Sequence, residues 1–94
     1  MTSIFQRGEH IPWQATHRVD GVLTTVDTSI NIVVLNPDGT TEVASTGMTE
    51  TDTGVYIYNQ ATVAGDQVGL YQATVTITHD SQVTIERLFA RLDP

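Results

Sequence analysis

Residues 52–78, DTGVYIYNQATVAGDQVGLYQATVTIT, decide the fold of this chain because they contain one pattern twice. In each copy a glycine stands two residues before a tyrosine, at Gly54 and Tyr56 and again at Gly69 and Tyr71. The second copy continues in strict alternation of apolar and polar residues through ATVTIT. Successive side chains of a strand point to opposite faces, so one face is expected on a core and the other in water. We therefore predict two central strands of an antiparallel β-sandwich.

The rest of the chain extends this pattern to about seven strands. The expected strands cover residues 4–6, 10–19, 29–35, 41–46, 54–60, 68–78 and 82–91. Turn signals separate them, and Asn36-Pro37-Asp38-Gly39 is the clearest, because proline fixes φ and glycine accepts positive φ. The polar residues 47–53 are expected to form a loop. Short strands with frequent turns are typical of an all-β sandwich.

The alternation slips in the last expected strand. Val83 and Ile85 are apolar in one phase, whereas Leu88 and Leu92 keep the other phase. A β-bulge near residues 86–87 would bring both sets onto the core side of the sheet, and we predict one there.

Length and composition limit what this chain can do. Its 94 residues suffice for one domain, so 1–94 are expected to form a single sandwich in which 1–8 are a short strand or an N-terminal arm. There is no cysteine, which excludes disulfides, thiolate metal sites and a cysteine nucleophile. The net charge of −7 disfavours nucleic acid and membrane surfaces as partners, because binding phosphates needs a basic patch. The N-terminal sequence lacks the features of a signal peptide, so synthesis in the host cytoplasm is expected.

Positive charge is confined to the two ends of the chain. Lysine is absent, and the four arginines are Arg7, Arg18, Arg87 and Arg91. The termini of a domain often lie close together, so Arg7, Arg87 and Arg91 are candidates for one partner-binding patch on an otherwise acidic body. The alternative is that the arginines are scattered and solvated.

Trp13 is the single tryptophan, and we expect it to be a core anchor because it shares one strand face with Ile11 and Ala15. The alternative is an exposed aromatic platform made of Trp13, Tyr56 and Tyr58, which would bind carbohydrate.

The residue patterns of catalytic and metal sites are absent. His10 and His17 are seven positions apart, so on a strand they face opposite sides about 23 Å apart and cannot share a metal. Glu50 and Asp52 are a candidate for calcium, which needs several converging oxygens. There is no nucleophile elbow and no phosphate-binding glycine loop. We therefore expect no enzyme activity, no catalytic residues, no cofactor and no metal.

Both tyrosine segments are similar to the D-x-G-x-Y-x-C run of immunoglobulin domains, in which the tyrosine hydroxyl bonds back to the preceding turn. Tyr58 or Ala73 occupies the cysteine position here, so the disulfide is missing. The expected architecture is an immunoglobulin-like antiparallel β-sandwich.

Four segments in order, RGEHIPWQA, VDTSINIVVLNPDGT, MTETDTGVYIYNQ and GLYQATVTI, resemble small immunoglobulin-like proteins encoded among the structural genes of tailed phages and prophages. The resemblance covers nearly the whole chain. It implies a non-enzymatic virion protein that docks on a capsid or head–tail neck assembly, in a decoration or joining role. Its partners would be other virion proteins, and a homo-oligomer is a further expectation. The alternative function is a carbohydrate- or cell-surface-binding module.

Overall fold

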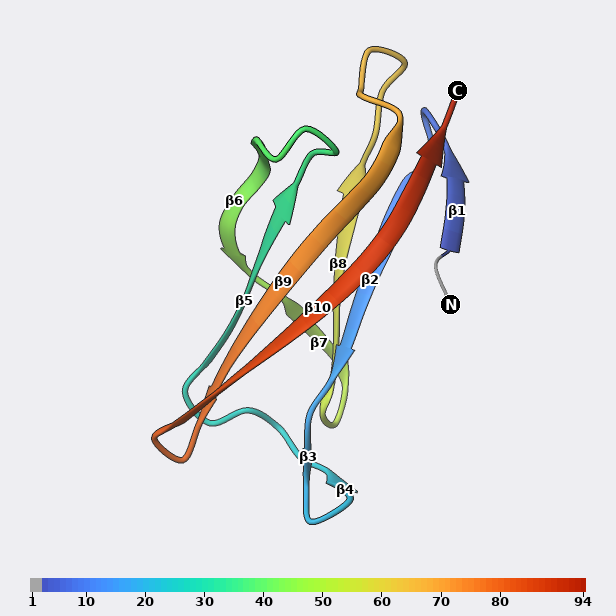
Figure 1. Ribbon diagram of the computed structural model, residues 1–94. Coiled ribbons are helices and arrows are strands. Elements are labelled where there is room, and N and C mark those ends of the chain that lie inside the picture. Colours follow the sequence, from blue (N-terminus) through green and yellow to red (C-terminus); the bar gives the residue numbers. More distant parts are fainter. Residues whose placement is uncertain (1–2) are drawn as a thin grey trace.

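The computed structural model describes residues 3–94, and its longest elements are β9 (Gly69–His79) and β10 (Gln82–Asp93). These two strands form an antiparallel hairpin that crosses the front of the molecule (Figure 1). Asp80 and Ser81 make the turn between them, with φ of 51° and 62°. Positive φ at both central residues is the type I′ geometry, which matches the twist of paired strands.

The hairpin is the centre of a five-stranded sheet with the order β1-β10-β9-β5-β6. β5 (Ser29–Leu35) and β6 (Thr41–Gly47) extend the sheet beyond β9, and the short β1 (Ser3–Gln6) runs parallel to the end of β10. Residues 1–8 were expected to be a strand or an arm, and Ser3–Gln6 are a strand. The first two of those residues lie outside the described part of the chain.

A second sheet packs behind the first, with the order β2-β8-β7. It consists of β2 (His10–Thr16), β7 (Thr49–Asp52) and β8 (Val55–Ala61). A small hairpin of β3 (Arg18–Val19) and β4 (Val22–Leu23) projects at the lower end in Figure 1.

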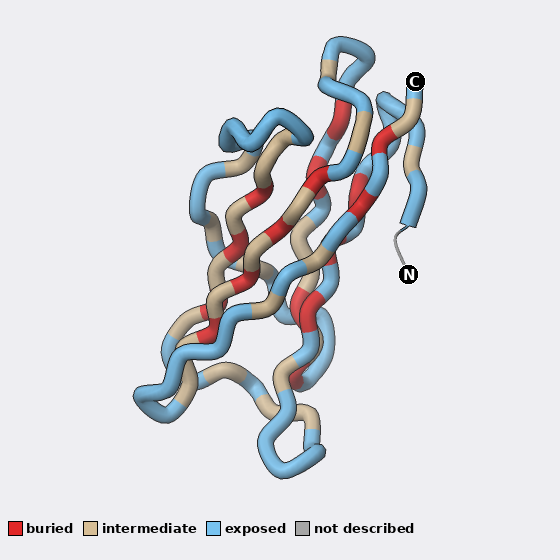
Figure 2. Tube along the Cα trace, in the orientation of Figure 1, coloured by how far each residue is buried: buried red, intermediate tan, exposed pale blue. Residues whose placement is uncertain are grey.

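The core lies between the two sheets, and the predicted phase of its main strands is confirmed. The buried apolar side chains alternate along β2, β5 and β9, as Figure 2 shows for the long strands. They are Ile11, Trp13, Ala15, Ile30, Ile32, Val34, Tyr71, Ala73, Val75 and Ile77. Trp13 is only 3% exposed, and its Nε1 donates a hydrogen bond to Oε1 of Gln60 at 2.8 Å. The prediction that Trp13 anchors the core is correct.

The bulge predicted near residues 86–87 is wrong. The pairing of β10 with β9 runs in one unbroken register from Gln82 opposite His79 to Leu92 opposite Gly69. Val83 and Ile85 are 62% and 55% exposed, so their apolar phase faces outward and not toward the core. The register does shift in another pair, between β5 and β6.

The strand count was also underestimated, because residues 3–94 contain ten strands rather than about seven. Residues 47–53, expected to be a loop, include β7, which pairs with β8. The expected strand 10–19 stops at Thr16 and resumes as β3. Gly54 lies against the break, where a Cβ on it would be 2.8 Å from the His17 carbonyl oxygen and 2.7 Å from the Thr24 nitrogen. The chain bends where these backbones cross in close contact.

Candidate functional site

The second tyrosine motif forms the expected link to its own turn. Tyr71 is fully buried, and its hydroxyl donates to the Gln67 carbonyl oxygen at 2.7 Å. Burial raises the pKa of Tyr71 to about 12, and the nearby Asp66 carboxylate contributes in the same direction. The first motif differs, because the Tyr56 hydroxyl accepts a hydrogen bond from the Val26 amide at 2.8 Å and so holds a distant segment.

The aromatic platform proposed as a carbohydrate site is not formed. Trp13 and Tyr56 are 3% and 5% exposed, and Tyr58 is half-buried against the core. Burial also raises the pKa of Tyr56. Alternation places Trp13 and Tyr56 on the inner face of their sheet, so these rings cannot stack on a ligand in solvent.

The structure brings two of the three candidate arginines onto one face. Arg87 and Arg91 are exposed and four residues apart on β10, so both point outward from the sandwich. Arg91 Nε lies 2.9 Å from Asp93 Oδ1 in an exposed ion pair. Arg7 follows β1 at the same end of the molecule, where its amide donates to the Asp93 carbonyl oxygen at 3.0 Å. Arg18 lies in β3, at the opposite end (Figure 1).

Exposed apolar residues surround Arg87 and Arg91. The unbroken register of β1, β10 and β9 places alternate side chains of all three strands on the outside of the five-stranded sheet. We call this surface the outer sheet face; its large residues are Ile4, Leu70, Val83, Ile85, Arg87, Phe89 and Arg91. All five apolar members are exposed.

The outer sheet face has a charge opposite to that of the whole protein. Among residues 3–94, the outward positions of its three strands β1, β9 and β10 carry two arginines and one carboxylate, Asp93, which sum to +1 (2 − 1). The complete chain carries −7. A partner that binds here meets apolar side chains and a local excess of positive charge.

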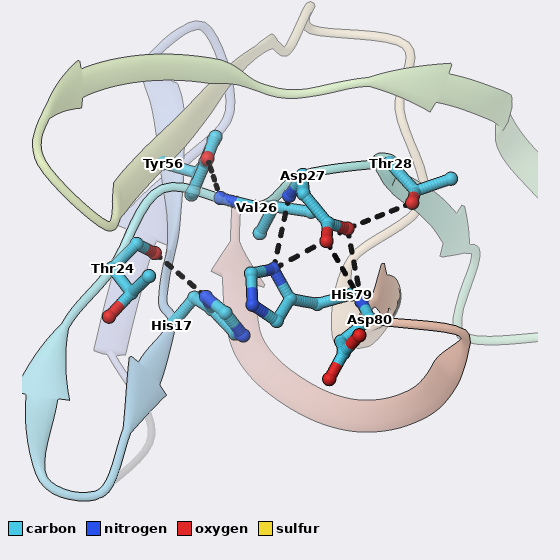
Figure 3. Close-up of polar contacts among 8 residues, drawn as sticks. All are labelled: His17, Thr24, Val26, Asp27, Thr28, Tyr56, His79 and Asp80. Carbon is cyan, nitrogen blue, oxygen red and sulfur yellow. Dashed lines mark hydrogen bonds and ion pairs between the residues drawn. The ribbon is translucent and has the colours of Figure 1, made fainter.

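A polar network ties the connector between β4 and β5 to both sheets at the lower end (Figure 3). His17 Nδ1 lies 2.7 Å from the Thr24 carbonyl oxygen, which requires a proton on that nitrogen. The Asp27 amide donates to His79 Nδ1 at 3.1 Å, and the Asp80 amide donates to the Asp27 carboxylate. The two imidazole rings lie side by side, with centroids 4.4 Å apart. These contacts hold the connector in place.

The carboxylates near this network bind backbone and hydroxyl groups. The Asp80 amide and the Thr28 hydroxyl hold the pKa of Asp27 below its usual value. The Thr25 hydroxyl and then the Gly54 amide lower the pKa of Glu50 in the same way. Residues 3–94 contain no group of three or more His, Cys, Asp or Glu side chains placed to hold a metal ion. Both hydrogen bonds to Glu50 are accepted by its Oε2, so this carboxylate links the segments of Thr25 and Gly54.

Two concave regions flank the β10 strand. The larger, about 400 Å³, lies at the lower end beside His17, His79 and Glu86. The smaller, about 250 Å³, lies between Phe5, Trp13 and Leu88, where β1 and β10 approach β2. The larger region is lined mainly by polar and charged side chains, and the smaller one mainly by apolar side chains.

No family model matches this chain, and no curated protein matches it in sequence. Among solved structures, the M1 domain from titin is similar in fold, with a TM-score of 0.51 and 16% identity over 98% of this chain and 84% of that chain. At this identity the likeness shows the fold alone. The strand orders agree with the immunoglobulin fold. In the smaller sheet, β2, β8 and β7 take the places of strands B, E and D. In the larger sheet, β10, β9, β5 and β6 take the places of strands G, F, C and C′.

The chain is therefore an immunoglobulin-like β-sandwich, and the expected fold class is confirmed. Trp13 stands on the B-like strand, whereas antibody domains carry their core tryptophan on strand C. In the described part of the chain, no helix is long and apolar enough to cross a membrane.

Sequence reasoning missed the outer sheet face and the contact between His17 and His79. The sequence did contain one signal for the outer sheet face, because Val83, Ile85 and Phe89 alternate along the strand with Arg87 and Arg91 on the same side. A phase that carries arginines is expected to face solvent, so apolar residues in it should be exposed. The second had no local signal, because 62 positions separate the two histidines (79 − 17).

Proposed function

We propose that this protein is a non-enzymatic structural component of a phage particle that docks on a capsid or head–tail neck protein through its outer sheet face. The observation that carries this proposal is the cluster of exposed apolar side chains beside Arg87 and Arg91 on a single sheet. Contiguous apolar surface of this kind marks interaction sites on soluble proteins. The four sequence segments that resemble phage structural proteins supply the virion setting.

The chemistry of the outer sheet face suits an acidic partner surface. An arginine guanidinium can bond one carboxylate in two places and is weakly hydrated, so it loses little when it enters an interface. Arg87 makes no ion pair within residues 3–94, and Arg91 is paired only with the exposed Asp93. Carboxylates on the docked protein would bind both arginines while the apolar side chains exclude water between them.

We do not propose the alternative function, carbohydrate or cell-surface binding, because two of its three candidate aromatic residues are buried. Decoration and joining remain two roles for the same docking face. Both require the protein in assembled particles, and both depend on Arg87 and Arg91.

The test is incorporation of a double variant, Arg87→Glu with Arg91→Glu, into particles of the phage that encodes the protein. We expect this variant to keep the melting temperature of the parent and to be lost from purified particles, as counted by quantitative mass spectrometry. Arg18→Glu is the matched control, because it reverses an exposed arginine at the opposite end of the molecule, and it should be incorporated fully.

Two results would contradict the proposal at different points. Particles that lack even the parent protein would remove the virion role. Particles that hold the parent and the double variant in equal number would keep the role and remove the arginines from the docking surface.

A further inference from the structure

We propose that two copies of this chain pair edge to edge through the first half of β10, in an antiparallel register centred on Ile85. The inference concerns a second copy as partner and does not depend on the virion role. It rests on the unpaired edge of β10, on the position of β1 and on the charges along the strand.

The first half of β10 has a free edge. β9 pairs with β10 over its length, but on the other side β1 covers only Ala90–Asp93, opposite Ser3–Gln6. In the described part of the chain, residues 82–89 therefore have backbone groups with no strand beside them. Such an edge is a template for another strand unless proline, a bulge or charged side chains protect it, and the charges on this segment are Glu86, at an inward position, and Arg87. This segment contains no lysine, proline or bulge.

The apolar residues of this edge favour strand addition. Val83 and Ile85 are more than half exposed on the outer sheet face, although they stand on a regular strand. Directly opposite residues of antiparallel strands point to the same side of the sheet. Pairing two copies about a two-fold axis through this edge would therefore place their outer sheet faces side by side as one continuous surface.

The position of β1 selects the register. With Ile85 opposite Ile85 of the second copy, Gln82 faces Leu88, and seven residues of each strand are paired (82–88). A shift of two positions toward the C-terminus would bring Gln82 of one copy opposite Ala90 of the other, where Ser3 already pairs. The opposite shift would lose two residue pairs. The register centred on Ile85 is thus the longest that β1 permits.

The charges agree with this choice. In the Ile85-centred register, Arg87 faces Val83 and Glu86 faces Thr84 of the second copy. The forbidden shift toward the C-terminus would instead set Glu86 directly opposite its own copy, and like charges in that position are destabilising. Glu86 of one copy is a diagonal neighbour of Glu86 of the other even in the favoured register, which limits the affinity.

The dimer should be weak and sensitive to salt. A single pair of strands buries less surface than a standard protein interface. Each copy also carries a net charge of −7, so the two bodies repel one another at low ionic strength. We expect a monomer–dimer equilibrium at high protein concentration that shifts toward the dimer when salt is added. Glu86→Gln should shift it in the same direction.

A charge-swap experiment tests the register directly. Ile85→Lys and Ile85→Asp each place like charges opposite one another on the two-fold axis. The dimer dissociation constant of each variant alone should therefore rise by about tenfold or more, as measured by sedimentation equilibrium. An equimolar mixture should recover dimers, because lysine then faces aspartate. Thr76→Lys is the matched control, since Thr76 is the neighbour of Ile85 on β9 but lies one strand away from the edge. This control should dimerise as the parent does.

Each other outcome overturns the proposal. A parent protein that stays monomeric at millimolar concentration in high salt excludes the edge-to-edge dimer. Equal loss of dimers in Thr76→Lys and Ile85→Lys would show contact through the outer sheet face. A mixture that stays monomeric would reject the Ile85-centred register. Both arginines are unchanged in these proteins, so these results are independent of the particle-docking experiment.

Discussion

The two halves of β10 are paired alike with β9 but buried differently. Near the chain ends, β10 contributes Ala90 and Leu92 to the core, and β1 and β2 lie beside it. Near the turn, every residue from Gln82 to Ile85 is exposed, and this part of β10 is pale blue throughout in Figure 2. The backbone ladder is continuous through both halves. Burial therefore confines the stability of this strand to one half and leaves the other half free for contacts outside the domain.

The largest expected effect comes from truncating one side chain in each half. Leu92→Ala removes a fully buried side chain and should lower the free energy of unfolding by about 2–5 kcal/mol. Ile85→Ala removes a more exposed side chain of similar size and should change it by less than about 0.5 kcal/mol. Urea denaturation of both variants at dilute concentration measures the difference. Similar losses would mean that the first half of β10 is packed against something within the domain.

A smaller effect is expected at alkaline pH, where Tyr71 reports on the half near the chain ends. Its folded pKa of about 12 lies above the usual value of 10, so the unfolded chain ionises first. The resulting stability is complete below pH 10 and is lost as pH rises from 10 to 12, by an amount on the order of 2 kcal/mol. Tyr71→Phe should be less stable at neutral pH but should lack this alkaline loss. Parallel alkaline unfolding curves for parent and variant would contradict the burial assigned to this hydroxyl.

The smallest effect is expected at acid pH, where Asp27 reports on the half near the turn. Its folded pKa is depressed, mainly by the hydrogen bond from the Asp80 amide. The stability that this provides is present above the ordinary pKa of about 3.8 and is lost as pH falls through the folded value. Asp27→Asn keeps an oxygen acceptor for the amide, so its melting temperature should fall less between pH 5 and pH 2 than that of the parent. An equal fall in both proteins would remove Asp27 from the acid response.

The sequence predicted those parts of the fold in which one face of a strand is buried. Strict alternation in β9, and alternation in the first half of β5, follows directly from one buried face, so their phase could be predicted from the residues alone. Trp13 was predicted as core for the same reason. The tyrosine motif at Tyr71 also predicted its hydrogen bond to the preceding turn, because that bond is local in the chain.

The remaining features depend on contacts between distant segments. Val83 and Ile85 were assigned to the core because apolar residues are usually buried, and only the unbroken register with β9 shows that they lie on the outer sheet face, away from the second sheet. β7 was missed because residues 49–52 are polar on both faces, and its pairing with β8 becomes visible only in three dimensions. The candidate arginines were chosen from their positions near the chain ends, and the pairing of β1 with β10 then determines where Arg7 and Arg91 lie.

The central claim, that one half of β10 is core and the other a free edge, is tested most directly by residue-resolved amide hydrogen exchange along this strand. In dilute protein, amides from Ala90 to Leu92 should be protected, whereas those of residues 82–87 that point away from β9 should exchange rapidly. At high concentration and high salt, the same outward amides should become protected as the second copy pairs with them. Strong protection of these outward amides in dilute protein would contradict the free edge. Rapid exchange at every concentration would leave the edge free but contradict the dimer.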